Sequence, residues 1–162
     1  MKSIEELVCE HPFLEGIDKT FLGHMAGCAE NASFKKDAYL IHEGDNADQF
    51  FLLRDGAVAL ESYAPGRGPI IFCTLKECDF LGVSWLTPPY RWQFDARAVE
   101  PVRAVAFDAK CLREKCDADP AIGYALMKKF VPDLMKRLQA ARVQMIDLYS
   151  CPPAGGAEDG AD

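Results

Sequence analysis

The sequence predicts a mainly β protein with flanking helices, in which a double-stranded β-helix (jelly roll) is followed by a long C-terminal helix. Between residues 32 and 107, short β-prone runs alternate with turns rich in glycine and aspartate, a pattern typical of a jelly roll. Apolar residues at helical spacing precede and follow this segment. The 162 residues suffice for one domain with its own core, which we expect over residues 1–149, followed by a disordered acidic tail over 150–162.

The composition indicates a cytoplasmic protein that does not bind DNA directly. Twenty-five acidic residues against 18 basic ones give a formal net charge of −7, which repels phosphate backbones. No apolar run approaches the roughly 20 residues that cross a bilayer. Glu5 and Glu6 stand where a signal peptide carries basic and apolar residues. We therefore expect no membrane association.

Short helices are predicted over residues 4–30, because proline and glycine interrupt apolar residues that recur at helical spacing. The β roll follows over residues 32–107. Its expected strands lie in YLIHEGD, FFLLRDG, AVALESY, PIIFCTL, DARAVE and VRAVAF. Gly44 and Gly56 lie where strands reverse, since glycine adopts positive φ at little cost.

C-terminal helices are predicted over residues 109–149. A short helix covers AKCLREKC, and a second one begins with Asp119 at the N-cap and Pro120 at the first helical position. Pro132 predicts a kink or a new start, because proline lacks an N–H and clashes with the preceding turn.

Beyond Pro132 the apolar residues step by four and three, which is the spacing of a heptad seam. The seam consists of Leu134, Leu138, Ala141, Met145 and Leu148. It predicts a homodimer through the C-terminal helix. The alternative is packing against its own domain, since little more than two heptads is short for a coiled coil.

The most specific motif is the hairpin over residues 41–58. It reads Ile41-His42-Glu43-Gly44-Asp45-Asn46-Ala47-Asp48, then Phe50-Phe51-Leu52-Leu53-Arg54-Asp55-Gly56-Ala57-Val58, and Gly66 or Gly68 and Phe80-Leu81-Gly82 follow at matching places. This pattern resembles the cyclic nucleotide-binding domain of the catabolite-activator type over residues 11–149. The resemblance implies a ligand inside the roll and a C-terminal helix that carries the dimer contact and relays the signal.

The resemblance also implies a phosphate-binding cassette after Gly82. In the family a Glu binds the ribose, N–H groups of a short helix face the cyclic phosphate, and an Arg neutralises it. Here Val83 stands at the Glu position and Trp92 at the Arg position, with Arg91 one place away. Losing both charged contacts costs roughly 3–6 kcal/mol, which weakens a micromolar binder to about 0.1 mM or worse.

A degenerate cassette is therefore expected. Its candidate ligand-binding residues are Gly82, Val83, Ser84, Arg91 and Trp92. The first three offer backbone N–H groups or a hydroxyl, Arg91 offers the countercharge, and Arg97 is the only other guanidinium nearby. The candidate ligand is a cyclic nucleotide (cAMP or cGMP) or a related phosphate. Four aromatic residues between positions 85 and 94 either wall a pocket for a planar ligand or fill the roll.

The expected function is a stand-alone sensor or regulatory module in signal transduction, without enzymatic activity. Family regulators continue into a helix-turn-helix that reads DNA. Residues 150–162 are acidic and offer no such element, so a protein partner of the C-terminal helix or the roll is expected. A cupin-type metalloenzyme is the less favoured alternative, because it needs clustered histidines and only His42 with Glu43 begins such a set.

Seven cysteines leave one further alternative. They are Cys9, Cys28, Cys73, Cys78, Cys111, Cys116 and Cys151. An odd number without an export signal predicts reduced thiols, and their spacing with only three histidines disfavours a metal site. A thiol- or cluster-based redox sensor on the same scaffold remains open, because Cys9 and Cys28 lie where some relatives sense redox state and basic residues flank Cys111 and Cys116.

Overall fold

The computed structural model describes residues 1–150 and divides into two compact units. The first unit, Met1–Leu126, contains both β-sheets and the N-terminal helices. Within the described residues, the second unit continues helix α4 (Pro120–Ser150) from Met127 onward. The predicted acidic tail lies outside the described residues except for Ser150. No described helix is long and apolar enough to span a membrane.

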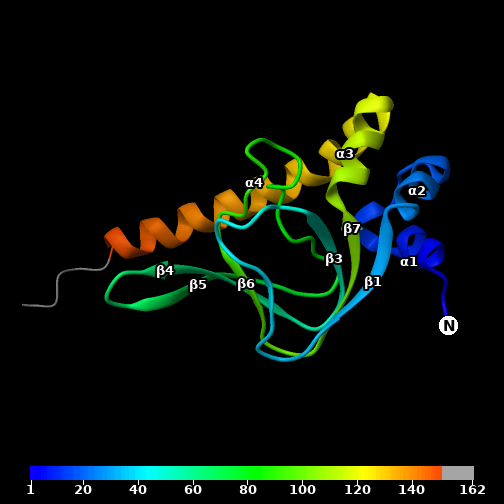
Figure 1. Ribbon diagram of the computed structural model, residues 1–162. Helices are drawn as coiled ribbons and strands as arrows, with labels where there is room; N and C mark the ends of the chain where they lie inside the picture. Colours follow the sequence, from blue (N-terminus) through cyan, green and yellow to red (C-terminus); the bar gives the residue numbers. More distant parts are fainter. Residues whose placement is uncertain (151–162) are drawn as a thin grey trace, which may run out of the picture. The chain divides into compact units, whose positions relative to one another are not determined.

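Two antiparallel sheets form the predicted jelly roll (Figure 1). The first has the order β1 (Ala29–Phe34), β7 (Val102–Asp108), β3 (Gln49–Asp55), and the second the order β2 (Tyr39–Ile41), β6 (Asp95–Ala98), β4 (Val58–Ala64), β5 (Gly68–Leu75). Four successive residues of β3, Phe50 to Leu53, are buried, so both faces of this strand are covered. Gly44 and Gly56 adopt positive φ at strand reversals, as predicted.

The N-terminal helices are short, as expected: α1 (Ile4–Glu10), η1 (Pro12–Leu14) and α2 (Lys19–Ala26). Strand β1 directly follows them and was not predicted from the sequence, which assigned helix up to residue 30. Its sequence AENASF is half polar and shows no clear alternation of buried residues. Pairing with β7, from Ala29 opposite Phe107 to Phe34 opposite Val102, supplies the hydrogen bonds that make it a strand.

The C-terminal helices begin at aspartate caps. Asp108 accepts a hydrogen bond from the Cys111 N–H at the start of α3 (Ala109–Ala118), and Asp119 accepts one from the Ala121 N–H at the start of α4. Of the two outcomes expected at Pro132, a kink or a new helix start, the new start is wrong, because α4 continues through this residue. Proline removes only its own N–H from the helix, and the bonds of the turns on both sides remain.

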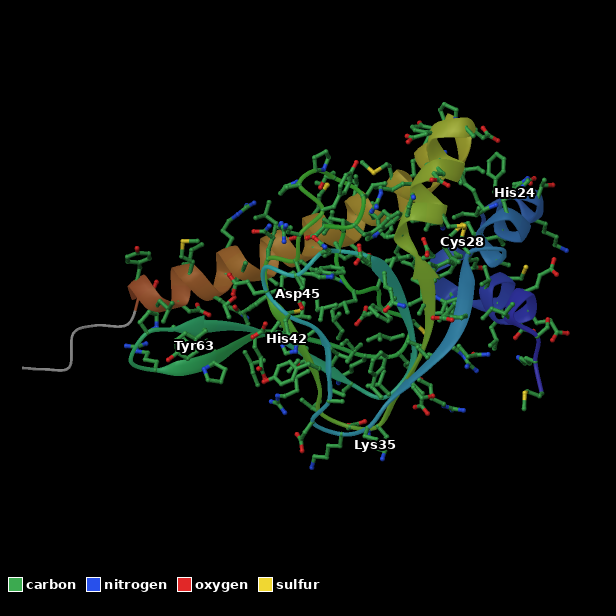
Figure 2. All side chains as sticks on the ribbon, in the orientation of Figure 1. His24, Cys28, Lys35, His42, Asp45 and Tyr63 are labelled. Atoms are coloured by element: carbon green, nitrogen blue, oxygen red, sulfur yellow. A yellow bond between two sulfur atoms is a disulfide. The ribbon has the colours of Figure 1, made fainter. Side chains whose placement is uncertain are left out.

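A disulfide joins Cys28 to Cys111, which corrects the prediction that all cysteines are reduced. The two residues are 83 positions apart in sequence, but the pairing of β1 with β7 brings the start of β1 beside the start of α3. Cys28, labelled in Figure 2, lies at the junction of α2 and β1. Cys9, Cys78 and Cys116 are free thiols among the described residues.

Candidate functional site

The candidate site begins at Gly82, after the fully buried Phe80 and Leu81. Gly82 has φ +68°, and a Cβ at this position would lie 3.1 Å from the Trp92 ring and 3.2 Å from the Phe94 ring. Glycine is therefore required here both for its backbone conformation and for the close approach of two aromatic rings. The structure thus brings Gly82 and Trp92 into contact.

Residues 83–89 form turns rather than a short helix. The Leu86 N–H donates to the Val83 carbonyl and the Tyr90 N–H donates to the Thr87 carbonyl, both over 3.0 Å. A helix N-terminus binds anions because several free N–H groups point the same way. This stretch of the described chain has no such helix, although Val83 and Ser84 are half-buried beside Gly82.

The two tryptophans of the cassette belong to the core. Trp85 is fully buried and stacks on Phe50, with ring centroids 5.1 Å apart. Trp92 is 3% exposed and lies 6.2 Å from the Phe94 ring. These rings occupy space inside the roll, which favours filling over the walling of an open pocket.

Arg91 points away from its buried neighbour Trp92. Its guanidinium Nη1 donates to the Gly44 carbonyl over 2.9 Å and is exposed to solvent. The backbone bonds the same two segments together, since the Gly44 N–H donates to the Trp92 carbonyl over 2.9 Å and the Trp92 N–H to the Asp45 carbonyl over 3.0 Å. Arg91 therefore holds the 42–48 loop against the cassette.

The Arg97 guanidinium is bound by two carboxylates. Its Nε lies 2.9 Å and its Nη2 2.7 Å from Glu61 Oε1, and its Nη1 lies 3.0 Å from Asp37 Oδ1. Glu61 is 2% exposed, and its hydrogen bond to Arg97 is the main reason that the pKa of Arg97 is raised. This guanidinium is neutralised by two carboxylates rather than left for a phosphate.

A cavity of about 200 Å³ lies against Trp92 under the 42–48 loop. Ile41 and Phe51 give it apolar walls, and Asp45 and Asp48 contribute carboxylates. No lysine or arginine is among its lining residues. Carboxylates without a countercharge repel anions, so this cavity does not favour a phosphate group.

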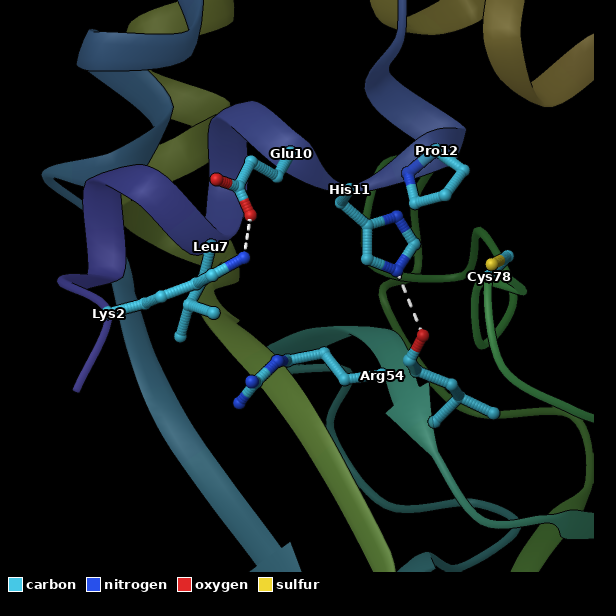
Figure 3. Close-up of a pocket in the computed structure, with 8 residues that line it drawn as sticks. Lys2, Leu7, Glu10, His11, Pro12, Arg54 and Cys78 are labelled. Atoms are coloured by element: carbon cyan, nitrogen blue, oxygen red, sulfur yellow. Dashed lines mark hydrogen bonds and ion pairs between the residues drawn. The ribbon is translucent and has the colours of Figure 1, made fainter.

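A second cavity, of about 230 Å³, lies where the N-terminal helices meet β3 (Figure 3). His11 forms part of its wall and is buried. Its Nδ1 accepts from the Phe13 N–H over 3.2 Å, so its Nε2 carries the proton that is donated to the Leu53 carbonyl over 2.9 Å. Burial lowers the pKa of His11, and this neutral imidazole fastens η1 to β3.

Arg113 of α3 is a cassette contact that the sequence analysis did not identify. Its Nη1 donates to the Trp85 carbonyl over 2.6 Å, and its guanidinium carbon lies 4.2 Å from the centre of the Tyr90 ring. In the sequence, Arg113 is one of the basic residues that flank Cys111 and Cys116, and no local pattern connects it to residues more than 20 positions earlier.

Within residues 1–150, no group of three His, Cys, Asp or Glu side chains is arranged to hold a metal ion. His42, the candidate start of a cupin-type site, has Asp95 at 3.8 Å. Such a site needs histidines clustered with a carboxylate, and the described residues do not assemble this set.

Comparisons with known proteins agree on one family. Residues 32–119 match the model described as the cyclic nucleotide-binding domain. A structure from Geobacter metallireducens GS-15, named as a cyclic nucleotide-binding protein, is 30% identical with a TM-score of 0.74, covering 85% of this chain and 99% of that one. No curated protein matches the chain at a significant level.

Two more distant structures share the fold. A cyclic nucleotide-binding domain from Methylobacillus flagellatus KT is 15% identical with a TM-score of 0.73, covering 89% of this chain and 81% of that one. The sensor domain of the transcriptional regulator DNR from Pseudomonas aeruginosa is 20% identical with a TM-score of 0.66, covering 83% and 91%.

Proposed function

This chain belongs to the cyclic nucleotide-binding domain family, and from that premise we propose that it is a sensor or regulatory module whose cassette has lost the family's charged contacts to a cyclic nucleotide. One observation carries the proposal. Trp92, at the position where the resemblance places the phosphate-binding Arg, is buried against Phe94 and Gly82. An indole in this place offers the cyclic phosphate no charge, and its ring fills the space beside Gly82 and Phe94.

The neighbouring groups support the same interpretation. Val83 has no carboxylate for a ribose hydroxyl, Arg91 is bonded to Gly44, and Arg97 is paired with Glu61 and Asp37. Moving either arginine to a phosphate would break contacts that it already makes. Each charged hydrogen bond lost in this exchange is worth about 1.5–3 kcal/mol, so a new phosphate contact would bring little net gain.

We place the output at α4. The resemblance to the family implies that the C-terminal helix carries a dimer contact. The seam residues lie on α4, where Leu138 is 63% exposed and Met145 and Leu148 are also exposed. In this proposal the homodimer presents α4 or the roll surface to a protein partner. A conformational change in the roll would then alter how the partner binds.

Calorimetric titration with cAMP and cGMP tests the cassette. We expect no saturable heat up to millimolar nucleotide, in the wild-type protein and in Arg91→Ala alike. Saturable binding at micromolar concentration in the wild type that is lost in Arg91→Ala would overturn the proposal, because it would show that Arg91 leaves Gly44 to bind the phosphate. Arg67→Ala, which changes an arginine in the β4–β5 turn, is the matched control.

A further inference from the structure

We propose that the Cys28–Cys111 disulfide is a reversible thiol switch that acts on the cassette through Arg113. The inference does not depend on the identity of the sensed ligand, since it concerns contacts within the first unit alone. The switch has two parts on α3: the disulfide at Cys111, and Arg113, which contacts the cassette.

The disulfide fixes α3 to the start of β1. Cys111 lies in the first turn of α3, and Cys28 immediately precedes β1 (Figure 2). The Asp108 N–H donates to the Cys28 carbonyl over 2.8 Å, so the two segments are already aligned by the backbone. The disulfide adds a covalent bond at the point where α3 follows β7. This bond limits how far α3 can move relative to β1.

Arg113 extends from the same helix to the cassette. Two helical positions differ by about 200° around the axis, so Cys111 and Arg113 leave α3 on nearly opposite sides. Arg113 holds the cassette by its hydrogen bond to the Trp85 carbonyl and by its position over the Tyr90 ring. The helix therefore connects the disulfide to the turns at residues 83–90.

The bond is suited to reversible chemistry. Cys111 is half-buried whereas Cys28 is buried, so a reductant approaches the pair from the Cys111 side. Disulfides in reducing compartments are usually transient and used for redox sensing, which reconciles this bond with the expectation of reduced cysteines from the sequence. Cys116, one turn further along α3, is buried, and this burial raises the pKa of its thiol and disfavours the thiolate that would compete.

The reaction balances with a dithiol reductant and with glutathione disulfide as oxidant. One thiolate of the reductant attacks a sulfur of the pair, the S–S bond breaks, and the second thiolate releases the mixed disulfide. Two electrons pass to the protein, which gains two thiols, while the reductant becomes a disulfide. Glutathione disulfide reverses the exchange and leaves as two glutathione thiols.

The test compares the full chain equilibrated with glutathione disulfide or with dithiothreitol. Alkylation and mass analysis should show Cys28 and Cys111 protected in the first buffer and modified in the second. On reduction we expect amide hydrogen exchange at residues 83–90 to rise several-fold, while β7 stays protected. The protein's two tryptophans report on these turns, since Trp85 lies within them and Trp92 follows them, so their fluorescence gives a second readout.

Three variants test whether the disulfide acts on the cassette through Arg113. Cys28→Ser/Cys111→Ser should show the fast cassette exchange in both buffers, and Cys9→Ser, which removes an exposed thiol of α1, should respond like the wild type. Arg113→Ala should remain reducible, but its cassette exchange should be equal in both buffers. Free thiols at both Cys28 and Cys111 in glutathione disulfide would overturn the proposal, because no disulfide would then form. Unchanged hydrogen exchange of the cassette on reduction, or a loss of protection in β7, would also overturn it. So would a redox response in Arg113→Ala as large as that of the wild type.

Discussion

At the scale of the residue, His11 makes stability depend on pH. The folded protein keeps the imidazole neutral, because burial lowers its pKa and because its Nδ1 must accept from the Phe13 N–H. The unfolded chain takes up the proton near the ordinary pKa of about 6.5. Between this value and the lower pKa of the folded state, the free energy of unfolding therefore falls as the pH falls, by at most about 1.4 kcal/mol per pH unit.

Urea unfolding between pH 8 and pH 5.5 measures this effect. His11→Gln cannot be protonated, so we expect it to be less stable at pH 8 and to lose most of the decline below pH 6.5. His24→Gln changes an exposed histidine of α2 and should keep the wild-type pH profile. An equally steep decline in His11→Gln would assign the pH dependence to another group.

The roles of single residues could be predicted from the sequence where they depend only on neighbouring residues in the chain. Gly44 and Gly56 could be identified because a positive φ at a strand reversal follows from the chain on either side. The substitution of Trp92 at the Arg position was also visible, but its burial was not. Cys28–Cys111 and the contacts of Arg113 could not be predicted, because they depend on segments that only the sheet pairing brings together.

At the scale of the element, the ion pair of Arg97 and Glu61 joins β6 to β4. Glu61 is almost fully buried, so Arg97→Met would leave a carboxylate in the protein without its partner. We expect the free energy of unfolding to drop by about 3 kcal/mol, since breaking one side of a buried pair is costly. Replacing both residues, in Glu61→Leu/Arg97→Met, should recover most of this loss, because no buried charge then remains.

Chemical denaturation of the three proteins checks this order of stabilities. Arg103→Met is the matched control, because Arg103 on β7 pairs with Asp55 over 2.9 Å where both side chains are exposed. Exposed pairs contribute little, so this control should unfold close to the wild type. An Arg97→Met protein as stable as the Arg103→Met control would show that the Arg97–Glu61 pair contributes no more than an exposed pair.

Among the elements, the sequence predicted those whose stability is encoded in their own pattern. The apolar strands β3 and β7 and the capped helices α3 and α4 were predicted in place. Strand β1 was missed because its polar sequence becomes a strand only beside β7. The new helix start, one of the two outcomes expected at Pro132, was wrong because a propensity was applied to a helix that has enough hydrogen bonds on both sides of the proline.

At the scale of the whole molecule, the output that we propose for α4 depends on dimerisation. The seam of Leu134, Leu138, Ala141, Met145 and Leu148 lies within one continuous helix, so a partner helix could follow it without interruption. Each leucine removed from water contributes about 1.5–3 kcal/mol, which gives this stripe enough apolar surface to favour association. A charge placed in the middle of the seam would be buried twice in a symmetric dimer and would lie close to its own copy.

Leu138→Glu is therefore expected to halve the mass that sedimentation equilibrium gives for the wild type at micromolar concentration. Val143→Glu is the control, because Val143 is also exposed but lies about 200° around the helix from Ala141, away from the seam. It should remain dimeric and show the same helix content by circular dichroism. A monomeric wild type, or a Leu138→Glu protein with unchanged mass, would show that the seam serves another purpose and that the output does not depend on self-association through α4.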